Sequence, residues 1–203
     1  MPTLSKIFLI AAFFSVAGCS APESYRLLPA PALESPVVNP PVQIRQKNWS
    51  VNGEGSCVHA SLSSMLHWQN EFELADKWRK TFGGGEYSNR LRQRLDQAGV
   101  PYAYTERSNL ELLDFAHNTR RGALLWWKPS HCCTFCGWVR DQSGKVYAVI
   151  LDNNRPQQYE LVEKSIFHKQ WAGYGGFALT TLYDPPSSPI YKSFEIASDL
   201  LPL

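Results

Sequence analysis

The chain has 203 residues, of which 44% are hydrophobic, and its 20 basic and 18 acidic side chains nearly balance. This length and apolar content predict one globular domain with additional segments. Lys and Arg form no runs, which argues against a nucleic-acid partner. The chain also has no internal repeat and no GxxxxGK[ST] phosphate-binding motif, so P-loop nucleotide hydrolysis is not among the expected functions.

The N-terminus has the pattern of a secretion signal. Lys6 is followed by an apolar run over residues 7–16, which is too short to span a bilayer as a helix. Two small residues then precede Cys19, as at a signal cleavage site. This stretch resembles the lipobox of bacterial lipoproteins. The resemblance implies a signal peptide over residues 1–18 and lipidation of Cys19.

We therefore expect an exported protein that a lipid at Cys19 anchors to the membrane of a bacterial cell envelope. Ser20, rather than Asp, follows this cysteine and favours the outer membrane by analogy with other lipoproteins. Proline is frequent over residues 19–42, which predicts an extended, semi-rigid tether. The globular domain is predicted over residues 43–183, and a proline-rich break starts a C-terminal tail at residues 184–203.

Within the domain, helices come first and strands later, which predicts an α+β fold with a helical half followed by an antiparallel sheet. Ser56 is a plausible N-cap for the first helix, Gly99 a plausible helix stop, and residues 141–145 a hairpin turn. The expected helices cover residues 57–69, 72–82, 88–98, 110–118 and 163–171. The expected strands cover residues 101–105, 123–127, 131–140, 146–152 and 176–183.

Cys57 is placed where thiol chemistry is favoured. A cysteine at a helix N-terminus faces unpaired backbone N–H groups and the positive end of the helix dipole, both of which stabilise a thiolate. The residues just before it are small or loop-forming, so a carbonyl group has room to approach. The alternative is a buried cysteine that packs as a small hydrophobic residue.

His131 and Asp152 are the expected partners of this thiol. His131 opens a long predicted strand and Asp152 ends the next one. Antiparallel pairing through the predicted turn places residue 131 opposite about residue 156, so the two side chains share one sheet edge. A thiol, a histidine and a carboxylate that orients the imidazole are the groups that nucleophilic catalysis requires.

Several segments resemble the papain-like cysteine peptidases. Residues 55–62 (GSCVHASL) are similar to the nucleophile helix of that superfamily, and residues 131–138 (HCCTFCGW) to its histidine strand. Residues 147–153 (YAVILDN) are similar to the strand that carries its third residue, with Asn153 as the alternative to Asp152. A Gly-aromatic pattern over residues 175–178 fits its last strand.

This resemblance implies a papain-like domain closest to the bacterial double-glycine, bacteriocin-processing branch, acting on peptide or protein substrates without a cofactor. The superfamily usually has a glutamine five or six residues before the cysteine. Here these positions hold Val51 and Asn52, so Asn52 and the more distant Gln46 are the candidate oxyanion donors. A catalytically inactive binding module and a transglutaminase-like acyl transferase remain open alternatives.

The cysteines near the histidine allow two other interpretations. His131, Cys132, Cys133 and Cys136 form a zinc-like set, but neighbouring strand residues point to opposite faces and there is no second CxxC pair, so we expect no metal. Cys133 is expected to share the face of His131, where an inhibitory disulfide with Cys57 is conceivable.

Two other features of the helical half are ambiguous in sequence. His59 points away from Cys57 on the predicted helix and is expected to be structural or exposed. Residues 83–85 (GGG) are either a flexible connection between helices or a backbone rim beside the substrate.

Overall fold

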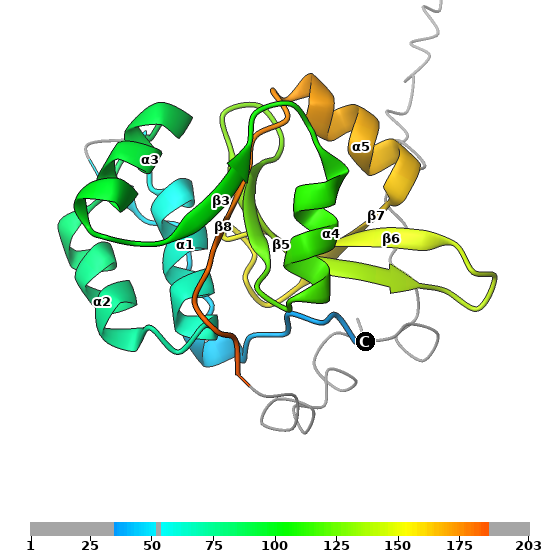
Figure 1. The fold of residues 1–203 in the computed structure, drawn as a ribbon, viewed down its shortest axis with the longest axis horizontal. Helices are drawn as coiled ribbons and strands as arrows, with labels where there is room; N and C mark the ends of the chain where they lie inside the picture. The colour runs from blue at the N-terminus through cyan, green and yellow to red at the C-terminus, as the bar shows by residue number, and fades with distance from the viewer. Residues whose placement is uncertain (1–34, 52–53, 187–203) are drawn as a thin grey trace, which may run out of the picture.

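The computed structural model describes residues 35–51 and 54–186. Within these ranges it has five α-helices, a six-stranded antiparallel sheet and a short hairpin (Figure 1), which confirms the α+β class. Cys19, Asn52 and most of the predicted tail lie outside the described residues. No helix in the described part of the chain is long and apolar enough to cross a bilayer.

The helices and strands follow the expected order along the chain. The helices are α1 (Cys57–Trp68), α2 (Phe72–Thr81), α3 (Ser88–Gln97), α4 (Leu110–Asn118) and α5 (Lys164–Gly173). The strands of the main sheet are β3 (Tyr102–Thr105), β4 (Ala123–Trp126), β5 (Cys132–Arg140), β6 (Val146–Leu151), β7 (Tyr159–Glu163) and β8 (Ala178–Thr181). The sheet order is β3-β8-β4-β5-β6-β7.

Two elements differ from the sequence prediction. The sequence does not predict strand β7. Its five residues are half-buried at a sheet edge and do not alternate clearly, so they lack the two-residue periodicity of a strand. The loop before Cys57 contains a hairpin of two short strands, β1 (Ser50–Val51) and β2 (Glu54–Gly55). Both corrections lie next to the predicted site.

The sheet separates two hydrophobic layers. Leu124 and Cys132 pack with α1, α2 and α3 on one face, whereas Leu125 and Cys133 pack with α4 and α5 on the other. Figure 1 shows these two groups of helices on opposite sides of the sheet. The alternation follows from the two-residue period of a strand. Both faces of β4 and β5 are therefore buried.

Helix α1 lies at the centre of the helical layer. All of its residues are buried, since the sheet covers one side and α2 the other. Its small polar residues are satisfied locally: the Ser63 hydroxyl donates to the Ala75 carbonyl at 3.1 Å, and the Ser64 hydroxyl to the Ala60 carbonyl at 2.9 Å. Small side chains let α1 and α2 approach closely.

The packed chain begins before the predicted domain boundary at Gln43. Val38 is 1% exposed, and its N–H donates to the Cys136 carbonyl at 3.1 Å. Asn39 is also buried, and its side chain accepts a hydrogen bond from the Tyr159 hydroxyl at 2.7 Å. The last residues of the predicted tether are thus part of the domain, because an apolar Val lies under the β5–β6 hairpin.

A β-bulge at Phe135–Gly137 changes the register between β5 and β6. Beyond it Thr134 pairs with Leu151, so continuing this register places residue 131 opposite residue 154 rather than the expected 156. Gly137 has φ 117°, a backbone conformation that favours glycine. An added Cβ there would lie 2.7 Å from Val37 and 2.9 Å from His117.

A Gly137→Ala substitution is expected to destabilise the fold more than Gly144→Ala, which serves as a matched control. Both glycines have positive φ, but a Cβ at Gly144 meets nothing within 4 Å. The control should cost about 1 kcal/mol and the bulge variant about 2–4 kcal/mol, because it adds a steric clash to backbone strain. Urea unfolding measures both, and equal losses would contradict the proposed clash.

Candidate active site

Cys57 is the first residue of α1 and is 9% exposed. The first N–H to bond within the helix is that of Ala60, which donates to the Ser56 carbonyl at 2.9 Å. The preceding N–H groups of α1 therefore lie outside the helical ladder, close to the thiol. Ser56 holds the N-cap position, but its hydroxyl does not cap the helix and instead accepts from the Gly84 N–H at 2.8 Å.

His131 precedes β5 and is positioned by a tight turn from β4. The Trp127 N–H donates to the His131 carbonyl at 2.9 Å, which closes this turn. The imidazole Nε2 lies 2.8 Å from Asp152 Oδ1. The contact with Asp152 leaves Nδ1 as the available ring nitrogen, and the imidazole acts on the Cys57 thiol, whose pKa it lowers. The structure thus brings the three predicted residues together.

Asp152 follows β6 directly and is 5% exposed. Its Oδ1 accepts hydrogen bonds from His131 and, at 2.9 Å, from the Asn154 N–H. Its Oδ2 accepts from the Lys128 ammonium at 3.1 Å. Because donors occupy both oxygens, the carboxylate is fixed with one oxygen facing the imidazole.

Asn153, the alternative third residue, does not face His131. Its Nδ2 lies 2.9 Å from the Cys57 carbonyl, 2.8 Å from the Cys132 carbonyl and 3.0 Å from the Ser61 hydroxyl. The side chain therefore joins the first turn of α1 to the beginning of β5. Its role in this structure is to hold the thiol at a fixed place relative to the histidine.

The electrostatics of the cluster favour a thiolate–imidazolium pair. Burial alone raises the pKa of Cys57, but the hydrogen bond and charge of His131, with the backbone N–H of Cys132, lower it below its ordinary value. Burial opposes protonation of His131, but the bonds to Asp152 and Cys57 raise its pKa to about 9. The same imidazole and the Lys128 charge hold the pKa of Asp152 well below its usual range, against the effect of burial.

The three cysteines of β5 lie in three different hydrophobic clusters and are free thiols. Cys133 shares the side of His131, as expected, since their donor atoms lie within 4.8 Å of one another. However, Cys132 rather than Cys133 shares the hydrophobic cluster of Cys57. Burial raises the pKa of each of the three thiols, that of Cys136 to about 12. They are therefore unreactive core residues, and the zinc-like set is split between faces.

In the described chain, one group of side chains has donor atoms close enough together to hold a metal ion. It consists of His131, Cys133 and Asp152, whose donor atoms lie within 4.8 Å of one another. The Lys128 ammonium already contacts Asp152 there and bonds Glu160 at 2.7 Å. A second cation at this place would meet that positive charge, and it would need to deprotonate a thiol whose pKa burial has raised. The donor set therefore fits a resident ammonium better than a metal.

Of the two expected oxyanion donors, Asn52 lies outside the described residues. Gln46 hydrogen bonds the Ile44 carbonyl through Nε2 at 3.2 Å and the Arg79 guanidinium through Oε1 at 2.8 Å. Its side-chain partners in the described chain thus lie away from Cys57 and His131.

Asn48 is a candidate oxyanion donor that the sequence did not indicate. Its Nδ2 lies 2.9 Å from Asn154 Oδ1 and 3.1 Å from an ideal Cβ at Gly55, so the amide sits between the nucleophile loop and the end of β6. The β1–β2 hairpin separates it from Cys57 in sequence, while the Ser56 N–H bonds the Trp49 carbonyl across the hairpin base at 2.8 Å. The Asn-Gly pair at residues 52–53 was the available signal for this hairpin.

The loop at residues 83–85 is packed beside the start of α1. Besides the bond from Gly84 to Ser56, the Gly85 N–H donates to Glu54 Oε2 at 3.0 Å, which links the loop to the β1–β2 hairpin. Of the two interpretations, this position favours a rim next to Cys57. His59 is buried and accepts from Trp78 Nε1 at 3.1 Å, so it is structural rather than exposed.

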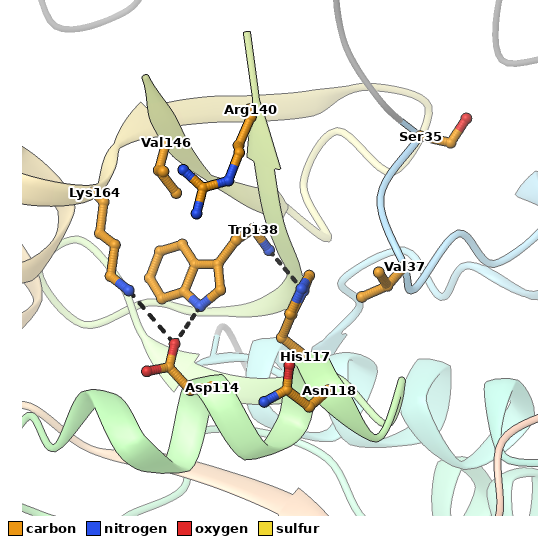
Figure 2. Close-up of a pocket in the computed structure, with 9 residues that line it drawn as sticks. All are labelled: Ser35, Val37, Asp114, His117, Asn118, Trp138, Arg140, Val146 and Lys164. Atoms are coloured by element: carbon orange, nitrogen blue, oxygen red, sulfur yellow. Dashed lines mark hydrogen bonds and ion pairs between the residues drawn. The ribbon is translucent and has the colours of Figure 1, made fainter. Parts of the chain in front are cut away.

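A separate concavity of about 360 Å³ lies at the far end of β5 from His131 (Figure 2). Its polar side chains bond one another: Asp114 Oδ1 accepts from Trp138 Nε1 at 2.7 Å and lies 3.5 Å from Lys164 Nζ. Because these groups satisfy each other, the concavity provides no argument for a ligand.

Comparison of the chain with protein-family models, curated proteins and solved structures finds no match.

Alkylation at about pH 6 should modify Cys57 selectively among the described cysteines, because its pKa is lowered while burial raises the others. A His131→Ala variant should shift the ionisation of Cys57 to higher pH and slow labelling at this pH by about tenfold or more. Peptide mapping by mass spectrometry after timed iodoacetamide treatment gives both results. Equal labelling of Cys57 and Cys132 would contradict the assignment.

Proposed function

We propose that this protein is an exported thiol hydrolase that cleaves peptide or related amide bonds. The observation that carries the proposal is the cluster itself: His131 Nε2 lies 2.8 Å from the buried carboxylate of Asp152, and the same imidazole lowers the pKa of the Cys57 thiol at the start of α1. A nucleophile, a base and a group that orients the base are the parts that covalent acyl transfer needs.

The order of the elements supports a papain-like arrangement. The thiol begins a buried helix, the histidine opens a strand of the antiparallel sheet, and the acid ends the strand that pairs with it. The site then lies at the junction of the helical layer and the sheet. This arrangement matches the resemblance seen in sequence at Cys57, His131 and Asp152.

In the proposed reaction the Cys57 thiolate attacks the carbonyl carbon, and the electron pair of the C=O bond moves to its oxygen. The backbone N–H of Cys57 and the Asn48 amide are the candidate donors to this oxyanion. When the C–N bond breaks, the His131 imidazolium gives its proton to the leaving amine. The neutral imidazole then takes a proton from water, whose oxygen attacks the thioester and releases the acid and the thiolate. Asp152 orients the ring and stabilises its charged form throughout.

Substitution of Cys57 or His131 by Ala should abolish turnover of a peptide library, and Asp152→Asn should lower kcat/KM by about 10²–10⁴-fold.

Activity should rise with pH as Cys57 ionises below its ordinary pKa. It should fall above about pH 9, where His131 loses the proton that the leaving amine needs. Mass spectrometry of library peptides at a series of pH values measures both effects. A Cys136→Ala variant is the control, since that thiol is buried in a separate hydrophobic cluster away from the proposed pathway. Unchanged turnover in Cys57→Ala would disprove the mechanism.

The residues before the domain support a membrane location for this activity. We propose that Cys19 carries the lipid, because it directly follows the apolar run and two small residues. In a bacterial host, the wild-type chain should fractionate with membranes and a Cys19→Ala variant should not carry lipid. Mass spectrometry of the mature N-terminus decides the point, and an unmodified wild-type N-terminus would refute lipidation.

A further inference from the structure

The turn between β4 and β5 places a lysine against the acid of the cluster. Lys128 has φ 70° and Ser130 φ 53°, both in the left-handed region that residues other than glycine rarely adopt. This turn directs the Lys128 side chain to the end of the sheet, where Asp152 follows β6. Unfavourable backbone geometry of this kind is often kept at functional sites.

The Lys128 ammonium is shared between two carboxylates. It lies 3.1 Å from Asp152 Oδ2 and 2.7 Å from Glu160 Oε1, and the side chain is 32% exposed. Glu160 comes from β7, the strand that sequence analysis did not predict. Its second oxygen, Oε2, is buried without a hydrogen-bond partner in the described chain, so Lys128 is the cation on which Glu160 depends.

We propose that Lys128 is a positioning residue that acts through Asp152: its ammonium neutralises Glu160 and so limits the negative charge that acts on His131. This inference rests on the proposed hydrolase function, because it explains how the imidazolium stays acidic enough to protonate a leaving amine. Without the ammonium, the negative charges of Asp152 and Glu160 would be uncompensated, and His131 would hold its proton more tightly.

The other groups around His131 leave this role to Lys128. The ring faces the Cys57 thiol from α1 and Asp152 from the end of β6, and Cys133 of β5 lies beside Asp152. Glu160 adds a second carboxylate from β7. Among the described side chains that contact Asp152, Lys128 is the permanent cation. Its own pKa, about 12, keeps it charged over the working range although burial opposes this.

The proposal predicts opposite effects for the two ends of the Lys128–Glu160 pair. Lys128→Met removes the positive charge and should raise the titration midpoint of His131 by about 0.5 pH unit or more. Glu160→Gln removes the competing negative charge and should lower the midpoint. The double variant should lie between the two single variants, because the removed charges compensate. Lys128→Arg should retain the wild-type value.

The experiment is a pH titration of the full chain, labelled with ¹⁵N-histidine and followed by NMR, with His131→Ala used to assign the signal. Lys145→Met is the matched control, because Lys145 pairs with Glu163 at 2.6 Å on the same sheet but does not contact Asp152. Lys128→Gly provides a second charge-removing variant, whose fold is expected to be less strained than that of the Met variant because glycine adopts the left-handed backbone at position 128 without steric cost.

The two outcomes separate this inference from the proposed function. Shifts of opposite sign in Lys128→Met and Glu160→Gln support the role of Lys128 whether or not a substrate is turned over. Shifts of the same sign, or no shift beyond the Lys145→Met control, would overturn it even if hydrolysis through Cys57 were established. Hydrolysis assays on the same variants then show whether the alkaline limb of activity moves with the His131 titration.

Discussion

The site depends on how two consecutive residues at the end of β6 are bonded. Asp152 binds the imidazole of His131, while the Asn153 amide binds the carbonyls of Cys57 and Cys132. One residue therefore orients the base and the next fixes the helix that carries the thiol. Because both belong to one backbone segment, the relative position of thiol and imidazole follows from a single junction between α1, β5 and β6.

Burial gives this junction its chemical selectivity. The four described cysteines are all buried, yet the thiol at the helix start is the one among them whose pKa the imidazole and backbone N–H groups lower. Burial keeps the β5 thiols protonated, whereas at Cys57 the imidazole and backbone N–H groups outweigh the same effect. The Asp152 carboxylate in turn balances the charge of the His131 imidazolium. The Lys128 ammonium contacts both Asp152 and Glu160. The site is thus an electrostatic network that extends from α1 to β7.

The sequence predicted the regular elements well where periodicity was strong. The apolar spacing in α1 and the long strands β5 and β6 were sufficient to place Cys57, His131 and Asp152 on neighbouring elements. It failed where short elements have little periodic signal. The strands of the β1–β2 hairpin have two residues each, and β7 has five. The hairpin lies between Asn48 and Cys57 in the sequence, and β7 carries Glu160.

What the amino-acid sequence determined by itself was the α+β order and the three candidate groups, because helix caps, hydrophobic spacing and turn residues act over short distances. Only the tertiary structure decided which neighbours these groups have. The bulge at Phe135–Gly137 sets the register that brings Asp152, rather than Asn153, to the imidazole. The contacts of Lys128 and Asn48 likewise depend on long-range packing between segments, which no local pattern encodes.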